Sequence, residues 1–286
     1  MRRLPALLLG SVWLLSCGEP GPPPAEVLKE ALTFHAGFED GMDGAFSLGD
    51  RRIYSAPSYK ELDRRSPGYW GTEIELAYDG GRFGHALRFN SKNEKALFYS
   101  AAEGNVAFST EGWTGTVSFW LSVDPENELA PGFCDPIQIT DSAYNDSAIW
   151  VDFTRETPRQ FRLGAFGELS AWNPDNKPND QNPGFNDRLV VVDQPPFASG
   201  KWTHVVIVHE NLGAPGGEAT LYLDGRSQGS SQGVSEPFEW DESTASIRVG
   251  VNYVGLFDDL ALFSTALTAE QVKALFELEG GAATLR

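Results

Sequence analysis

Runs in which every second residue is apolar recur along the chain, and they constrain the fold more than any other feature. In "TVSFWLSV" the residues at 117, 119, 121 and 123 share one face of an extended strand, and Ser118 and Ser122 lie on the other. Similar runs are "AIWVDFT", "QFRLGAF", "LVVVD", "THVVIVH", "ATLYLDG" and "SIRVGV". Loops rich in Gly, Pro and Asn separate them. The sequence therefore predicts an all-β fold, a two-sheet antiparallel jelly-roll sandwich.

One short helix is expected near the C-terminal end. Thr268 and Gln271 form a capping box before an apolar stripe, and Gly280 and Gly281 end the helix. The other long interruption is polar: residues 172–187 read "WNPDNKPNDQNPGFND". Loops of this length are uncommon unless they have a function or are disordered.

Several phrases together resemble a known family. In chain order they are "FHAGFEDGMDGAF", "GRFGHALRF", "GTVSFWLSVD", "KWTHVVIV", "ATLYLDG" and "GLFDDLALFSTALTAEQV". They resemble the laminin-G-like, concanavalin A-like jelly-roll domains of bacterial exported proteins, over about residues 32–279. The resemblance implies a two-sheet sandwich whose first and last strands lie in one sheet. It implies no single activity, since members bind sugars, proteins or cations and some relatives on the fold are glycosidases.

The N-terminal segment predicts export. Arg2 and Arg3 precede an apolar stretch too short to span a bilayer, so residues 1–16 are expected to be a signal peptide. The ending "LLSC" resembles the bacterial lipobox, which implies cleavage before Cys17 and acylation of that residue. With Gly18 next, an outer-membrane or cell-surface lipoprotein is expected. The alternative is an ordinary signal peptide with a chance cysteine.

The remaining boundaries follow from composition. Residues 17–30, with consecutive prolines, are expected to form an extended tether between the lipid and the domain. The domain itself is placed at 31–280 and a tail at 281–286. Lipidation of Cys17 would leave Cys134 alone, so a packed thiol and no internal disulfide are expected.

Charge excludes one class of partner. With 22 basic and 40 acidic residues the formal net charge is −18, which argues against nucleic-acid binding. The acidity serves either solubility or cation binding.

The sequence offers no convincing catalytic motif, so an enzyme is not expected. The paired carboxylates of retaining glucanases need two acids on one strand face, whereas Asp241 and Glu242 in "EWDES" are adjacent and point to opposite faces. "GSSQG" lacks the strand before it and the helix after it that a nucleophile elbow requires. A glycoside hydrolase remains the least favoured alternative.

A carbohydrate site is the leading expectation. In "AIWVDF" one strand face is wholly apolar, which leaves Trp150 and Asp152 on the other face to line a groove. The residues expected to bind ligand are Trp150, Asp152, Tyr144 and Asp146 in and before this strand, and Trp172 and Asn173 in the long loop. Two alternatives stay open: the tryptophans are buried core beneath the loop, or the aromatic rim binds a protein partner.

Calcium is the one expected cofactor, in a structural role. Because the resemblance makes the first and last strands neighbours, it brings Glu39 and Asp40 near Asp258 and Asp259. Converging carboxylates repel one another unless a cation lies among them, and oxygen ligands alone favour Ca²⁺. The alternatives are that Asp258 accepts backbone N–H groups or pairs with Arg248.

Overall fold

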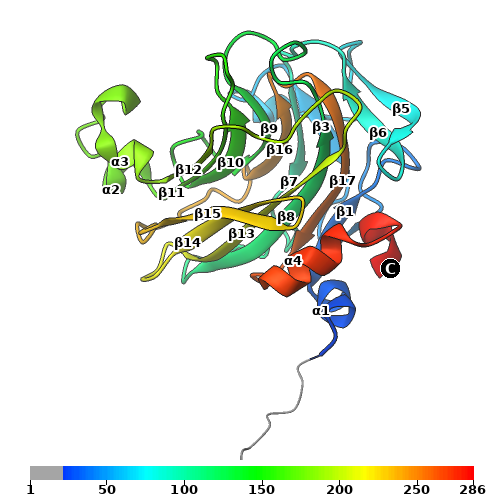
Figure 1. Cartoon of the computed structure of the whole chain (residues 1–286). Coiled ribbons are helices and arrows are strands. Elements are labelled where there is room, and N and C mark those ends of the chain that lie inside the picture. Colours follow the sequence, from blue (N-terminus) through cyan, green and yellow to red (C-terminus); the bar gives the residue numbers. More distant parts are fainter. Residues whose placement is uncertain (1–21) are drawn as a thin grey trace, which may run out of the picture.

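Alternating apolar residues build two antiparallel sheets that pack face to face (Figure 1) in a computed structural model that describes residues 22–286. The nine-stranded sheet, sheet A, follows the order β15-β14-β13-β8-β17-β1-β2, with β6 also on β17 and β5 on β6. Its strands are β1 (Leu32–Ala36), β2 (Phe46–Ser47), β5 (Ile74–Gly81), β6 (Gly84–Phe89), β8 (Trp113–Ser122), β13 (Thr203–Leu212), β14 (Glu218–Leu223), β15 (Arg226–Gln232) and β17 (Gly255–Phe263).

The eight-stranded sheet, sheet B, follows the order β12-β11-β10-β9-β16-β7-β3-β4. Its strands are β3 (Ile53–Ala56), β4 (Ser66–Pro67), β7 (Ala96–Ser100), β9 (Cys134–Thr140), β10 (Ala148–Phe153), β11 (Phe161–Phe166), β12 (Leu189–Val192) and β16 (Ser246–Val251). The helices are α1 (Pro24–Ala31), α2 (Leu169–Trp172), α3 (Pro183–Asn186) and α4 (Ala269–Phe276), with short 3₁₀ turns η1 (Leu62–Arg64), η2 (Asn179–Gln181) and η3 (Gly281–Leu285). The predicted two-sheet sandwich with a short C-terminal helix is confirmed.

The main core lies between the sheets and contains one face of the central strands of both sheets. In β8, Val117, Phe119 and Leu121 are buried there, as the period of two predicts. From sheet B, Ile149 and Val151 of β10 meet them. Strand β1 pairs with β17, which is the neighbour relation that the resemblance implies.

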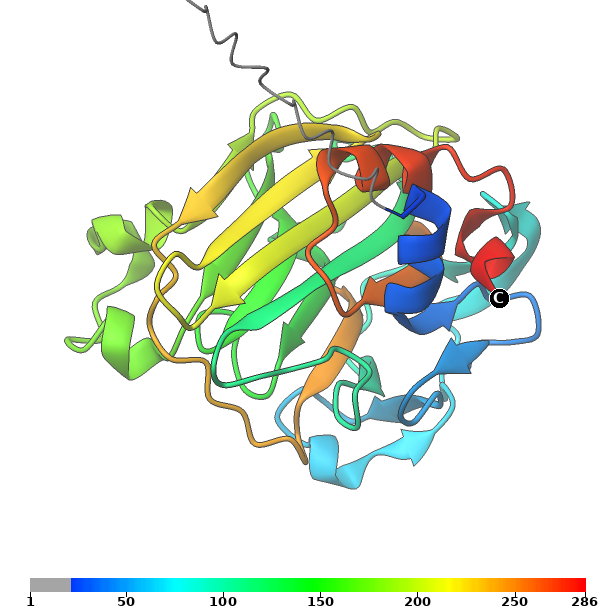
Figure 2. The same cartoon turned by 90° about the horizontal axis from the view of Figure 1, so that it is seen from below.

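A second apolar cluster covers the outer face of sheet A. Helices α1 and α4 cross this face (Figure 2), and Leu28 of α1 packs in one cluster with Val206 of β13 and Val272 of α4. Thr268 caps α4 through the predicted capping box with Gln271. The helices therefore cover part of the outer face of sheet A, whereas the outer face of sheet B carries the larger of the two cavities described below.

The expected boundaries of the tether and the tail were wrong in two places. Residues 24–31 form helix α1 and not an extended tether, because Pro24 stands in the first turn, where its missing N–H costs nothing, and Leu28 and Ala31 are buried. Residues 281–286 are not a loose tail: Ala282 and Leu285 of η3 are buried in the same apolar cluster. The folded unit includes both segments.

Residues 1–21, with the expected signal peptide and Cys17, lie outside the described residues. Within residues 22–286, no helix combines the length and the apolar character needed to cross a bilayer.

Candidate functional site

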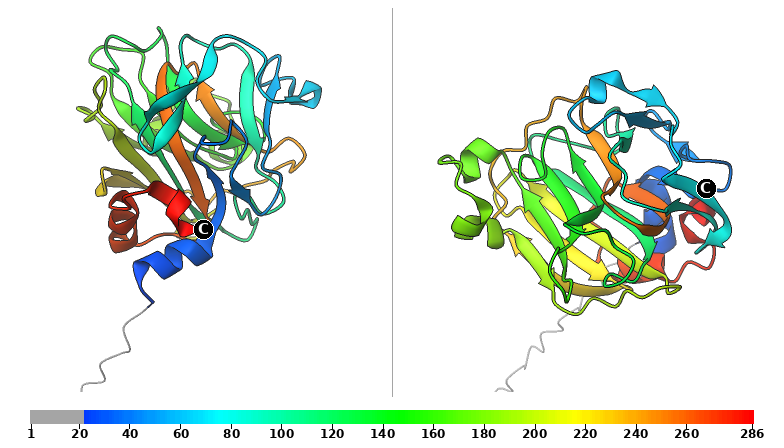
Figure 3. Two further views of the ribbon diagram at one scale, coloured as in Figure 1. Left: turned by 90° about the vertical axis from the view of Figure 1, so that its right-hand side faces the viewer. Right: turned by 90° about the horizontal axis from the view of Figure 1, so that it is seen from above.

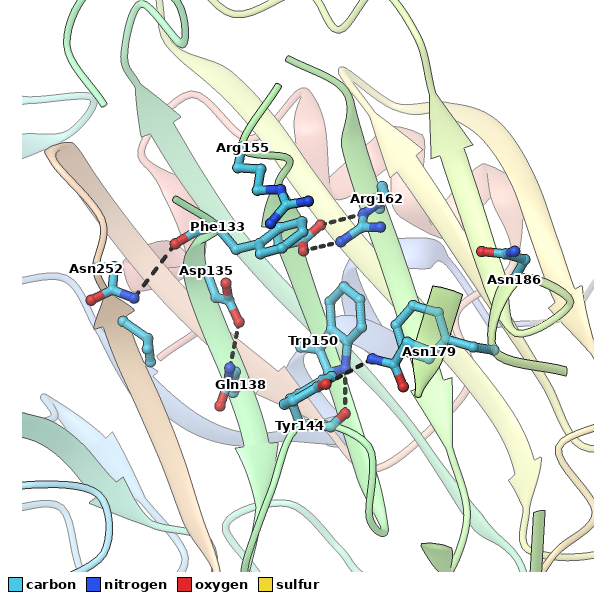
Figure 4. Close-up of a pocket in the computed structure, with 13 residues that line it drawn as sticks. Phe133, Asp135, Gln138, Tyr144, Trp150, Arg155, Arg162, Asn179, Asn186 and Asn252 are labelled. Carbon is cyan, nitrogen blue, oxygen red and sulfur yellow. Dashed lines mark hydrogen bonds and ion pairs between the residues drawn. The ribbon is translucent and has the colours of Figure 1, made fainter. Parts of the chain in front are cut away.

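A cavity of about 660 Å³ opens on the outer face of sheet B (Figure 4). Strands β9, β10, β11 and β16 form its base, and helix α3 with the preceding η2 turn stands beside it (Figure 3). The residues that line the cavity are Phe133, Asp135, Gln138, Tyr144, Trp150, Asp152, Arg155, Arg162, Asn179, Phe185, Asn186, Val251 and Asn252. This volume lies within the usual range for small-molecule sites.

Polar side chains form most of the floor of the cavity. Gln138 of β9 and Asp152 of β10 point away from the core because the neighbouring residues Ile137 and Val151 face inward. Asp135 reaches the same cavity because the β9–β10 pairing shifts register between Ile137 and Cys134. Each of the three polar side chains belongs to a residue less than a tenth exposed. Burying such polar groups costs free energy unless they are hydrogen-bonded, so the side chains of the floor require hydrogen-bond partners.

Trp150 forms the apolar part of the floor, but its ring faces are already covered. It stands opposite Gly164 of β11, where an added Cβ would lie 2.3 Å from the indole ring. Its ring stacks on Phe166 with centroids 5.9 Å apart, and its indole N–H donates to the carbonyl of Tyr144. With 1% of its surface exposed, Trp150 supports the cavity and offers no open face to a ligand.

The accessible aromatic rings stand at the rim. Phe133 and Tyr144 are each 41% exposed. The guanidinium groups of Arg155 and Arg162 lie 5.8 and 5.1 Å from the centroid of the Phe133 ring. The Tyr144 hydroxyl accepts a hydrogen bond from the side chain of Asn179 at 2.7 Å. The rim therefore combines two partly exposed aromatic rings with several hydrogen-bonding groups.

The two carboxyl groups of the floor have different partners. Arg162 donates from Nε and Nη2 to the two oxygens of Asp152, the first at 2.8 Å, so this pair is bidentate. Within residues 22–286 Asp135 forms no ion pair, and its one hydrogen bond comes from the amide of Gln138. Burial and then the charge of Asp152 raise the pKa of Asp135 to about 8. Burial also raises the pKa of Asp152, while Arg162 opposes that rise.

The raised pKa of Asp135 predicts that the stability of the protein depends on pH, and that the Asp135→Asn substitution reduces this dependence. The folded protein holds a proton on Asp135 that the unfolded chain releases near pKa 3.8, so stability should fall as pH rises from about 4 to about 8. The Asn variant cannot ionise, so its stability should decline less over this range and exceed that of the unaltered protein above it. Urea unfolding of both proteins across this pH range measures the difference; parallel pH profiles would contradict the assignment of the proton.

Of the six residues expected to bind ligand, the structure brings three into the cavity: Trp150, Asp152 and Tyr144. Trp172 is 8% exposed and packs with Phe166 and Phe185 beneath α2 and α3, where its indole N–H donates to the Asn145 carbonyl. The expectation that its ring is available to a ligand was wrong, because the loop folds inward around it.

Asn173 and Asp146 also serve the loops and not the cavity. The Asn173 side chain donates to the carbonyl of Lys177 and accepts from its N–H, which fixes the turn after α2. Asp146 accepts from the N–H of Leu169 at 2.7 Å and so ties the β9–β10 loop to the start of α2.

Sequence reasoning missed most of the remaining lining residues. Asp135 and Gln138 break the apolar pattern of "CDPIQIT", and that irregular pattern was a usable signal. Arg162 lies directly across from Asp152 in the β10–β11 pairing, so the cross-strand ion pair was also accessible once the register was assumed. Phe133 and Asn252 come from loops whose positions depend on tertiary packing.

Each of the adjacent aspartates of β17 has hydrogen-bond partners within the protein. At a bulge in the pairing with β8, Asp258 accepts backbone N–H groups from Arg82, Phe83 and Asp259, at 2.7, 3.0 and 2.7 Å. Asp259 contacts Nε2 of His35 at 2.8 Å. The alternative in which Asp258 accepts backbone donors thus describes the structure.

The expected calcium ligands are not gathered into one site. Glu39 accepts from the N–H of His85, and Asp40 is exposed. Among residues 22–286 no group of three or more His, Cys, Asp and Glu is arranged to hold a metal ion. Glu39, Asp40 and Asp259 instead line a second cavity of about 430 Å³. Calcium binding stays a prediction for which the described residues supply no ligand set.

Comparisons with known proteins connect this fold to others. The profile of the concanavalin A-like lectin/glucanases superfamily, in its Laminin_G_3 form, matches residues 98–273. A comparison with curated proteins gave no match.

Solved structures with the same fold share little sequence with this chain. Domain 4 of AbnA, a GH43 extracellular arabinanase from Geobacillus stearothermophilus solved in complex with arabinotriose, is 18% identical with a TM-score of 0.52, over 86% of this chain and 98% of that one. The botulinum neurotoxin serotype D ligand binding domain in complex with N-acetylneuraminic acid is 12% identical with a TM-score of 0.55, over 89% of this chain and 52% of that one. The sialidase of Trypanosoma rangeli is 12% identical with a TM-score of 0.53, over 88% and 34%. At these sequence identities the similarity shows a shared fold alone.

Proposed function

Because the chain belongs to the concanavalin A-like lectin/glucanases superfamily, we propose that it is a non-catalytic binding module whose ligand is a carbohydrate. The observation that carries the proposal is the cavity on sheet B, in which the exposed rings of Phe133 and Tyr144 stand above a buried, hydrogen-bonding floor. Pyranose and furanose rings have apolar faces and polar edges, which match this combination. Two of the similar structures contain a bound saccharide, which supports the same class of ligand.

A hydrolase is the alternative that the two carboxyl groups raise. Retaining glycosidases need one carboxylate free to attack and a second that carries a proton. Here both oxygens of Asp152 accept hydrogen bonds from Arg162, so Asp152 is not free to act as the nucleophile. Asp135 therefore has no free carboxylate beside it to complete a catalytic pair. We therefore propose binding without catalysis.

Export and anchoring complete the proposal. The basic and apolar residues 1–16 and the "LLSC" ending support a lipoprotein held in a membrane through Cys17. Replacing Cys17 with Ala should move the protein from the detergent phase to the aqueous phase in a phase-separation assay, and retention in the detergent phase would contradict the anchor.

Truncation of the Tyr144 ring tests the ligand class. On a glycan array, the purified protein should bind a restricted set of saccharides, and Tyr144→Ala should weaken that binding about tenfold or more because the ring face is lost. Tyr144→Phe is the matched control: it keeps the ring and loses only the hydrogen bond to Asn179, so most binding should remain.

Stability separates loss of contact from loss of fold. Since Tyr144 is 41% exposed, its truncation should move the melting temperature little. If the unaltered protein binds no saccharide on the array, the proposal fails, and protein recognition by the same two rings becomes the remaining function.

A further inference from the structure

We infer that the cavity on sheet B receives the terminal unit of a neutral saccharide chain, which enters with two neighbouring hydroxyl groups directed at Asp135 and Gln138. The inference rests on the proposed function and specifies which part of a carbohydrate the site binds. Three features carry it: unpartnered polar atoms on the floor, walls on three sides, and a balanced charge.

The floor presents hydrogen-bonding atoms that the described part of the chain leaves without partners. Gln138 Nε2 donates to Asp135 Oδ2, but Gln138 Oε1 and Asp135 Oδ1 make no hydrogen bond within residues 22–286. Gln138 is 7% and Asp135 8% exposed, so only a group that enters the cavity reaches these atoms. An amide oxygen accepts, and a protonated carboxyl donates. Two neighbouring hydroxyls of a sugar offer the matching donor and acceptor.

The walls favour a chain end over an internal unit. Phe133 and Arg155 stand at one end of the strands and Tyr144 at the other (Figure 4). Phe185 and Asn186 belong to α3 and line a third side. A unit that reaches the buried floor is enclosed on these three sides. An internal unit has two glycosidic bonds that must both leave the cavity, whereas a terminal unit has one.

The charges around the cavity favour a neutral sugar. Arg162 is paired with Asp152, and Arg155 is paired with Glu156 at 2.5 Å. No unpaired cation among the lining residues is therefore available to a carboxylated or sulfated sugar. The formal net charge of −18 also disfavours the approach of a polyanion.

Dependence of affinity on chain length tests the inference with the full-length protein. The probes are the methyl glycosides of glucose, galactose, mannose, xylose and arabinose, compared by calorimetry with linear oligosaccharides and the polysaccharide built from each sugar. For the sugar that binds, the methyl glycoside and its oligosaccharides should have dissociation constants within about threefold of each other. An affinity that rises about tenfold or more with added units would overturn the inference, since it indicates a groove for internal units.

The same titrations distinguish failure of chain-end recognition from failure of carbohydrate binding as a whole. If long chains bind and no methyl glycoside does, chain-end recognition fails and carbohydrate binding stands. If no saccharide of any length binds, the proposed function itself fails. Binding of uronic acids in preference to the neutral glycosides would overturn the assignment of a neutral ligand.

Gln138→Leu examines the floor directly. The variant keeps the approximate size of the side chain and removes the accepting oxygen, so binding of the methyl glycoside should weaken about tenfold or more. Gln228→Leu is the matched control, because Gln228 is exposed on β15 and lies away from the cavity. Unchanged affinity in a folded Gln138→Leu protein would remove this residue from the site.

Discussion

Replacement of Asp258 by Ala should lower the free energy of unfolding by about 3–5 kcal/mol, whether calcium is present or not. The carboxylate accepts from three backbone N–H groups, and Asp258 is fully buried. Ala would leave these three donors without an acceptor at a site that water does not reach. Denaturant unfolding, followed by tryptophan fluorescence in EDTA and again in excess Ca²⁺, measures the loss.

Asp258→Asn provides the matched control for that experiment. Its amide oxygen can still accept, while its NH₂ group faces the other donors, so the loss should be smaller than with Ala. If EDTA alone lowers the melting temperature of the unaltered protein, or if Ca²⁺ restores the Ala variant, a cation contributes to this site and the hydrogen-bond account is incomplete.

Replacement of Trp172 by Ala should also cost about 3–5 kcal/mol of stability. The buried ring packs against both Phe166 and Phe185, the Arg188 guanidinium lies 5.2 Å from its centroid, and its N–H donates to the Asn145 carbonyl. Thermal melting and urea unfolding measure this loss, and Trp172→Phe should recover a large part of it.

Ligand binding by the Trp172→Ala variant discriminates between the two roles of this ring. Below its melting temperature the folded fraction should bind the array glycan as tightly as the unaltered protein, because Trp172 does not line the cavity. If the variant keeps its melting temperature but no longer binds the glycan, Trp172 contacts the ligand and the structural role is wrong.

Local pattern was sufficient to predict the sheets and insufficient to predict which rings are accessible. The alternation in β8 and β10 fixes which face is core, so Trp150 and Asp152 were correctly directed away from it. Whether Trp150 is open depends on its neighbours across the strands, since Gly164 lets the indole lie flat and Phe166 stacks on it. That outcome requires the register of β10 and β11, which a single strand does not contain.

Loops limited the prediction of the site for a related reason. Trp172 is the last residue of the four-residue helix α2, and a polar loop composition gives no indication that one ring of the segment turns inward. Phe133 enters the rim from the loop before β9, and nothing in its immediate sequence distinguishes it from an ordinary exposed ring. The carboxylates of β17 illustrate the same limit, because their donors come from residues 82 and 83, far away in sequence.

Helix α1 has a consequence for how an anchored molecule would stand at a bilayer. The helix packs against the outer face of sheet A (Figure 1), and the cavity opens on the outer face of sheet B. If Cys17 is acylated, the seven residues from Cys17 to Pro23 can span at most about 25 Å, compared with roughly 40 Å for the whole expected tether. This short connection, which joins the domain at α1, would turn the cavity away from the bilayer surface. Neighbouring anchored copies would then present their sites in one plane to the same polymer.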